Sequence, residues 1–296
     1  MKQDVTVGQV ARYRNLAVAP IYSDDFFMEE VLMLDKALQK EGFTITGSKV
    51  NVMEITNSLD EKVMVVGGAT IEREEGQKRY AKFPALIMPH TSVGLPVNCA
   101  EQGESRIGGR YGGNSTIVMP CLRAGDISQR EAWSSIENTR SFLRRMNPTI
   151  FMTQTSSYIA DVEKNVNIEY YLDAIGRQPR TGQVGIVAGI RSGSDTIYYT
   201  DFFGRHQILS EAYDKLAKSF GIVAGIHKGS ADDISVDDLA GFFKKFHVAR
   251  AEIHPHVGAG SLYLLRHQED KAELTGTALA YEDAPVQITM REKVER

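Results

Sequence analysis

Hydrophobic positions along the first third of the chain change their period twice, and each change predicts a different kind of element. Residues 15–21 form a short apolar run, which is typical of a strand. Apolar residues then recur at spacings of four, three and four, which predicts a helix: Phe27, Val31, Leu34 and Leu38. Between 43 and 99 the period becomes two, in short segments rich in β-branched residues and separated by turn residues. Because these turns are too short for crossover connections, we expect an antiparallel sheet.

Strand and helix patterns alternate through the rest of the chain. A glycine-rich loop at 108–113 leads into a predicted strand at 115–121. Ser128 and Glu131 have the spacing of a capping box, which predicts a helix that ends near 147. The remaining predicted elements are helices at about 162–175, 209–220 and 235–246, a hairpin around the turn at 191–195, and strands between 250 and 292.

These elements together predict an α+β protein with an antiparallel β-rich core and about four or five flanking helices. The chain has 296 residues, enough for one large domain or two of average size. We expect a single α+β unit over 1–296. The alternative is a division into a β-rich part, 1–147, and a mixed part, 148–296, because the pattern is weakest at 147–160.

Charge and composition narrow the class of protein. The 34 basic and 38 acidic residues are spread along the chain without a run of five or six like charges, so no nucleic-acid partner is indicated. No window approaches 18 apolar residues, and the N-terminus lacks the apolar block of a secretory signal. Two cysteines are too few for a disulfide framework. We therefore expect a cytoplasmic protein that does not enter a membrane.

The densest set of candidate functional groups lies between 67 and 113. It comprises Glu72, Arg73, Glu74, Glu75, Gln77, Arg79, Cys99, Glu101 and Arg106. Cys99 lies near the end of an apolar strand, with Glu101 two residues on and so on the same face. A thiolate nucleophile at Cys99 would need a positive neighbour, which Arg79 or Arg106 would supply. The favoured alternative is a buried, unreactive thiol.

The glycine loop at 108–113 is the second candidate. Its backbone N–H groups are suited to bind an anion, Arg110 would supply positive charge, and Tyr111 would stack on a base. It matches neither a Walker loop nor a dinucleotide fingerprint, because the lysine of the first and the helix of the second are missing. The favoured alternative is a mobile hairpin connection without a ligand.

Two histidines form the third candidate. His254 and His256 alternate along a predicted strand and so point the same way, as two metal ligands would. A third ligand would have to come from elsewhere, and His227 and Glu252 are the available residues. Because two histidines alone do not make a site, ordinary structural histidines are the favoured alternative. The sequence identifies no cofactor.

Several segments resemble the first type of ARPP domain, the ADP-ribosylglycohydrolase- and rhodanese-phosphatase-superfamily-associated protein domain. The resemblance rests on a leucine–alanine–leucine helix motif, a glycine-led turn, and a cysteine motif. These are Leu34, Ala37 and Leu38; Gly68, Gln77 and Arg79; and Pro96, Val97, Cys99, Glu101 and Gly103. The chain departs from the family pattern after Gly68, where Ala69 replaces a glutamate, and after Gly103, where no tryptophan follows.

The resemblance implies a nucleotide or ADP-ribose-like ligand. Our hypothesis is a protein that binds or processes such a phosphorylated small molecule. Its site would comprise Gln77, Arg79, Cys99, Glu101, Arg106, Arg110 and Tyr111. On this hypothesis Arg79→Ala and Arg106→Ala abolish binding with little change in melting temperature. The alternative is a non-enzymatic scaffold that assembles into a homo-oligomer through an exposed strand.

Overall fold

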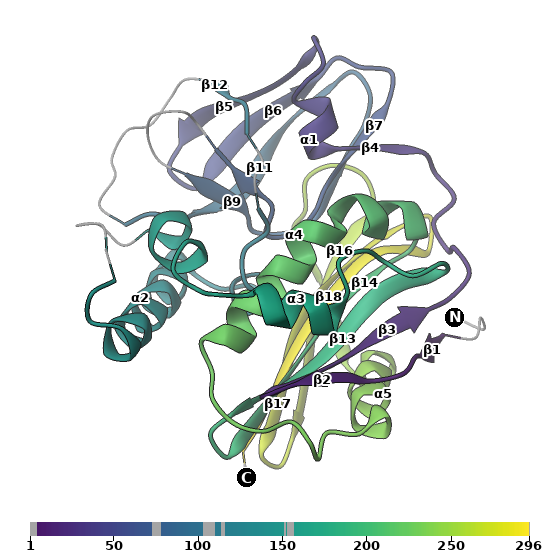
Figure 1. Ribbon diagram of the computed structural model, residues 1–296. Helices are drawn as coiled ribbons and strands as arrows, with labels where there is room; N and C mark the ends of the chain where they lie inside the picture. The colour runs from purple at the N-terminus through teal and green to yellow at the C-terminus, as the bar shows by residue number, and fades with distance from the viewer. Residues whose placement is uncertain are drawn as a thin grey trace.

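A nine-stranded antiparallel sheet forms the larger part of the molecule (Figure 1). The structure is a computed structural model that describes residues 5–72, 78–102, 110–113, 116–150, 152 and 157–295. The strand order is β1-β3-β13-β14-β18-β17-β16-β15, and β2 pairs with β3. The strands are β1 (Thr6–Val7), β2 (Ala11–Tyr13), β3 (Leu16–Tyr22), β13 (Gln183–Ser192), β14 (Asp195–Phe203), β15 (Arg250–His254), β16 (Ser261–Glu269), β17 (Ala272–Tyr281) and β18 (Ala284–Val294). The first strands of the chain thus belong to the same sheet as the last ones.

Two smaller sheets hold the strands between 31 and 111. The six-stranded one has the order β12-β5-β6-β11-β9-β8 and is antiparallel, as the period of two predicts. The three-stranded one has the order β10-β7-β4, in which β4 runs parallel to β7. The strands are β4 (Val31–Met33), β5 (Phe43–Lys49), β6 (Val52–Asn57), β7 (Lys62–Val65), β8 (Thr70–Ile71), β9 (Arg79–Ala81), β10 (Ala85–Ile87), β11 (Thr91–Cys99) and β12 (Arg110–Tyr111).

Helices cover both faces of the large sheet. The described helices are α1 (Leu34–Ala37), α2 (Gln129–Met146), α3 (Glu169–Ile175), α4 (His206–Gly225), α5 (Val236–Lys244) and the short turns η1 (Pro120–Leu122), η2 (Tyr158–Glu163) and η3 (Lys245–His247). α4 shares a core with the smaller sheets, whereas Leu239, Phe242 and Phe243 of α5 pack in a separate cluster on the other face. The predicted α+β class with flanking helices is confirmed. None of the described helices is long and apolar enough to cross a membrane.

Three predicted elements are wrong in detail. The helix expected from Phe27 to Leu38 is reduced to α1, because Val31–Met33 pair with β7 instead. The strand expected at 115–121 is replaced by one isolated bridge, Ala69 to Ile117, followed by η1, which Pro120 opens. The helix expected at 162–175 is divided into the π-helical turn η2 and α3. In each case long-range pairing or packing overrides the local pattern.

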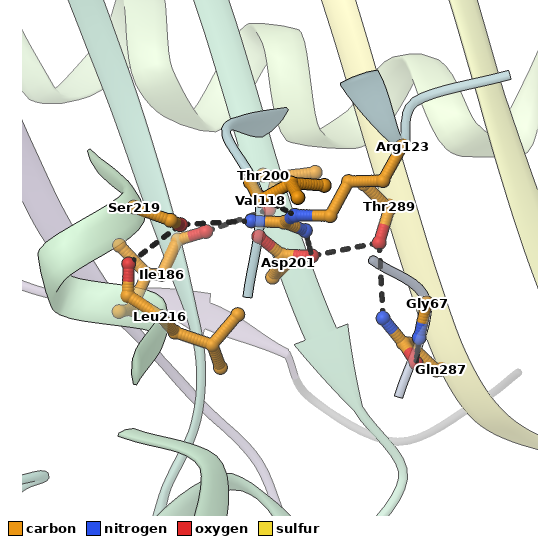
Figure 2. A network of polar contacts seen from close by, with 10 residues as sticks. All are labelled: Gly67, Val118, Arg123, Ile186, Thr200, Asp201, Leu216, Ser219, Gln287 and Thr289. Atoms are coloured by element: carbon orange, nitrogen blue, oxygen red, sulfur yellow. Dashed lines mark hydrogen bonds and ion pairs between the residues drawn. The ribbon is translucent and has the colours of Figure 1, made fainter. Parts of the chain in front are cut away.

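A buried polar network joins η1 to the large sheet and to α4 (Figure 2). Arg123 forms an ion pair with Asp201 of β14, and neither side chain has any solvent exposure. The Arg123 guanidinium also donates to the Val118 carbonyl at 3.0 Å and to the Ser219 hydroxyl of α4 at 3.2 Å. Thr289 of β18 donates to Asp201 at 2.7 Å. The network therefore fixes four elements from distant parts of the sequence, η1, β14, α4 and β18, against one another.

Gly68 allows this arrangement. Its φ of +83° lies in the left-handed region that favours glycine. A Cβ at this position would lie 2.4 Å from Cδ of Arg123. The glycine is therefore required by the close approach of the Arg123 side chain.

Candidate functional site

Two glutamates lie at the ends of a chain of hydrogen bonds that passes through Thr70 and Thr116 beside β8. Thr70 of β8 has its hydroxyl 3.1 Å from Oε1 of Glu72. The same hydroxyl accepts a hydrogen bond from the Thr116 backbone N–H at 3.2 Å and lies 3.1 Å from the Thr116 carbonyl oxygen. The Thr116 hydroxyl in turn donates to Oε1 of Glu163 at 2.6 Å. We call Thr70, Glu72, Thr116 and Glu163 the carboxylate cluster.

The glycine loop is next to this cluster. The backbone of Glu72 pairs with that of Gly113, with N–H to carbonyl distances of 2.8 and 3.2 Å, and Gly112 donates to the Glu72 carbonyl at 3.1 Å. The described end of the loop is therefore fixed on one side of the cluster. Both Glu72 and Gly113 remain partly exposed.

The π-helical turn η2 carries Glu163, and two contacts fix it. Asp161 forms an ion pair with Arg140 of α2 at 2.7 Å, in which both side chains are almost fully buried. Tyr158 N–H donates to the Ala100 carbonyl at 3.0 Å, at the end of β11. π-Helical turns recur at functional sites, where they place a side chain that a regular helix would turn away. The position of Glu163 is thus set by both α2 and β11.

Burial raises the pKa of Glu163 to about 7. The hydrogen bond from Thr116 lowers the pKa, the negative charge of Glu72 raises it, and Lys218 and Lys78 lower it, but burial has the largest effect. The carboxyl group is therefore partly protonated near neutral pH. A group with this pKa can both donate and accept a proton at physiological pH.

Glu101 accepts two hydrogen bonds next to the cluster. Its Oε2 accepts from the Lys78 backbone N–H at 3.2 Å, and its Oε1 accepts from the Ser157 hydroxyl at 3.1 Å. The backbones of Glu101 and Ser157 also form an isolated antiparallel bridge. The Glu101 carboxylate thus links Lys78, which precedes β9, to Ser157, which precedes η2. Glu101 itself stays partly exposed.

Arg79 and Tyr111 lie in the interior rather than on the surface. Arg79 has no solvent exposure and donates to the Lys49 carbonyl at 2.6 Å. Its guanidinium carbon lies 5.9 Å from the centroid of the Tyr111 ring, which is only 1% exposed. The Tyr111 hydroxyl is buried and has no hydrogen-bond partner among the described residues. Because Arg79 is fully buried, its charge would act on a ligand only from a distance.

Cys99 is a fully buried thiol. It pairs with Arg79 across β11 and β9, and its Sγ lies 3.8 Å from the Val50 carbonyl. Burial raises its pKa, the nearby charge of Arg79 lowers it, and that of Glu101 raises it. The amide side chain of Gln129 bonds both the N–H and the carbonyl of Cys99, at 2.6 and 3.0 Å. At neutral pH the resting group is therefore the thiol rather than the thiolate.

The other predicted residues divide into two sets. Gln77 and Arg106 lie outside the described residues, and of Arg110 only the backbone, in β12, is described. His254 packs against Phe83, with ring centroids 4.9 Å apart, and burial lowers the pKa of His256 to about 4. In the described part of the chain, no three metal-binding side chains gather into one group, and neither His227 nor Glu252 completes a site with these histidines.

The sequence pattern missed Glu163 and both threonines. Glu72 was part of the predicted set, but Glu163 follows it by 91 positions and lies in a segment predicted as an ordinary helix. No local motif marks a carboxyl group that becomes buried through long-range packing. The antiparallel bridge at Ile117 brings Thr116 to Thr70, and a two-residue pairing of this kind leaves no periodic signal.

The fold and the cluster define a β-rich α+β protein with a partly buried carboxylate pair at the edge of its smaller sheets. The model of one family, described as the "ARG and Rhodanese-Phosphatase-superfamily-associated Protein domain" (ARPP-1), matches residues 4–290. The chain therefore belongs to this family, as the sequence resemblance indicated. The family name links the domain to the ADP-ribosylglycohydrolase and rhodanese-phosphatase superfamilies. Comparisons with curated proteins and with solved structures give no match.

Proposed function

We propose that the chain binds a ribose-bearing, phosphorylated small molecule of the ADP-ribose class at the carboxylate cluster. The observation that carries this proposal is the linked pair of Glu72 and Glu163, joined through Thr70 and Thr116, with the pKa of Glu163 raised to about 7. Carboxylates are strong acceptors for the vicinal hydroxyls of a ribose. A carboxyl group that titrates near neutral pH supplies a proton to a departing or developing oxyanion.

Each residue has a role in this proposal. Glu72 accepts from ribose hydroxyls, and the protonated form of Glu163 donates to an oxygen of the ligand. Lys78, whose charge acts on Glu163, together with the N–H groups of the glycine loop, faces the phosphate. Cys99 lines the site and does not act as a nucleophile, because its thiol is buried.

The other residues proposed from sequence alone also take part in this proposal. Arg106 and Arg110 bind phosphate, Gln77 contacts the ligand, and Glu101 acts as a second acceptor or base. Arg79 and Tyr111 support the site from beneath, since both are buried against each other. The family name is consistent with an ADP-ribose-related ligand and does not identify a reaction.

Calorimetric titration of the purified protein with ADP-ribose, ADP, ribose 5-phosphate and inorganic phosphate tests the proposal. We expect ADP-ribose or ADP to bind more tightly than phosphate. Glu163→Ala is expected to weaken that binding by roughly tenfold or more, because the hydrogen bond from the protonated carboxyl group to the ligand is lost. Glu41→Ala, which removes an exposed carboxylate from the turn before β5, is the matched control. If no compound binds, or if both variants bind equally well, the proposal is wrong.

A second candidate, a self-assembling scaffold, has one observation in its favour. β15 is the last strand of the nine-stranded sheet, and among the described residues it pairs with β16 alone; Ile253 on it is 78% exposed. Open strand edges can pair with a second chain, although charged residues such as Arg250 and Glu252 oppose this. Sedimentation at micromolar concentration tests this candidate. A strict monomer would remove it, and a dimer that Ile253→Lys dissociates would support it.

A further inference from the structure

A cavity of about 360 Å³ lies between α2, the end of α4 and the large sheet. Its sheet side is formed by β14 and β18, and Phe142 and other residues of α2 cover it. Cys121 of η1 and Ser192 at the end of β13 also line it. This volume is within the range of small-molecule sites. None of the lining residues belongs to the carboxylate cluster.

A partly buried cation that forms no ion pair among the described residues lines this cavity. Arg291 of β18 lies directly opposite Tyr199 of β14 in the sheet. The Nε of Arg291 is buried and has no hydrogen-bond partner among the described residues. Tyr199 forms a hydrogen bond with the Arg291 side chain, and the charge of Glu273 acts on it, but no Asp or Glu lines the cavity. A guanidinium is always charged, and a charge removed from water is costly unless an anion accompanies it.

Two further basic residues lie at the same cavity. Lys228 is exposed, so its ammonium group is available at the mouth of the cavity. His227 is partly buried, and burial together with the charge of Arg291 lowers its pKa. It is therefore neutral at physiological pH and can donate one N–H to a ligand. The polar groups of the cavity thus favour a negatively charged group.

The remaining walls are apolar. Phe142, Ile197, Val223 and Ile226 line the cavity beside the cationic residues. An inorganic ion would leave these walls in contact with water, whereas an organic body would cover them. We propose that this cavity is a second small-molecule site, which binds a small organic anion with an apolar body, its carboxylate or phosphate on Arg291.

Titration with three probes of similar shape tests this site. Phenylacetate presents a carboxylate, phenyl phosphate presents a phosphate, and benzyl alcohol has the same apolar body without a charge. We expect one or both anions to bind and the alcohol to bind far more weakly. The stronger of the two anions identifies the acid group that the site prefers. Equal binding of the alcohol, or no binding of either anion, would overturn the proposal.

Three substitutions place the binding in the cavity. Arg291→Gln is expected to weaken anion binding by roughly tenfold or more, because a charged hydrogen-bond donor is lost. Lys228→Gln, at an exposed position, is expected to weaken it about threefold. Arg144→Gln removes an equal charge from the exposed face of α2 and should have no effect. If Arg291→Gln does not fold, the Lys228→Gln variant provides the test. An anion affinity of Lys228→Gln that equals that of Arg144→Gln would contradict the proposal.

Discussion

At Glu163, burial and hydrogen bonding act on one carboxyl group in opposite directions. Burial prevails and raises the pKa from an ordinary value of 4.5 to about 7. The folded protein therefore binds a proton more tightly than the unfolded chain does. The stabilisation from this group is complete below about pH 4.5 and is lost as the pH rises through 7.

Glu163→Gln should therefore stabilise the protein in a pH-dependent manner. Glutamine keeps an acceptor for the Thr116 hydroxyl and avoids the cost of burying a charge. The gain in the free energy of unfolding should approach about 3 kcal/mol above neutral pH and disappear near pH 4.5. Urea unfolding across this pH range measures it, with Glu41→Gln as control. A difference that does not change with pH would show that Glu163 is not perturbed by burial.

Arg79 shows how burial changes the expected effect of a substitution. The sequence-based hypothesis treats Arg79 as an exposed ligand contact whose removal leaves the melting temperature unchanged. Because Arg79 is fully buried and bonded to the Lys49 carbonyl, we expect Arg79→Ala to destabilise the fold by about 3 kcal/mol. Thermal melting measures this, with Arg130→Ala on the exposed side of α2 as control. An unchanged melting temperature would contradict this structural role and support the hypothesis that Arg79 contacts the ligand.

Elements with local start signals were predictable from the sequence. Ser128 with Glu131, and Ser235 with Asp238, form the capping boxes that begin α2 and α5. β4 was not predictable, because its parallel partner β7 lies some thirty residues away and gives no local signal. The same limit applies to the site: Glu72 and the glycine loop are local features, whereas Glu163 reaches them only through the packing of η2.

The first residue of α2, Gln129, forms hydrogen bonds with the end of β11 in the smaller sheets. The amide of Gln129 bonds both backbone groups of Cys99, as a neighbouring strand would. Gln129→Ala should leave these buried groups unpaired and cost about 2 kcal/mol. Arg130→Ala, one residue on and exposed, should cost little. Hydrogen exchange at the Cys99 amide is the direct measurement, and unchanged protection would mean that another group replaces the glutamine.

At the scale of the whole molecule, the network of Arg123 and Asp201 fixes η1, the large sheet and α4 together (Figure 2). Arg123→Met should cost about 3–5 kcal/mol, because it leaves the Asp201 carboxylate buried without a counterion. The double variant Arg123→Met/Asp201→Leu should lose less than the sum of its parts. Urea unfolding of the single and double variants measures this coupling. Strictly additive losses would show that the pair does not act as a unit.

In the proposed function, Glu163 takes part in binding a ribose-bearing phosphate ligand. The most direct test is calorimetric titration of wild type and Glu163→Gln with ADP-ribose at about pH 6 and about pH 8. Because the protonated carboxyl donates to the ligand, wild type should bind up to about tenfold more tightly at the lower pH. Glu163→Gln should bind equally at both. A wild-type affinity that is the same at both pH values, or no binding at all, would contradict the claim.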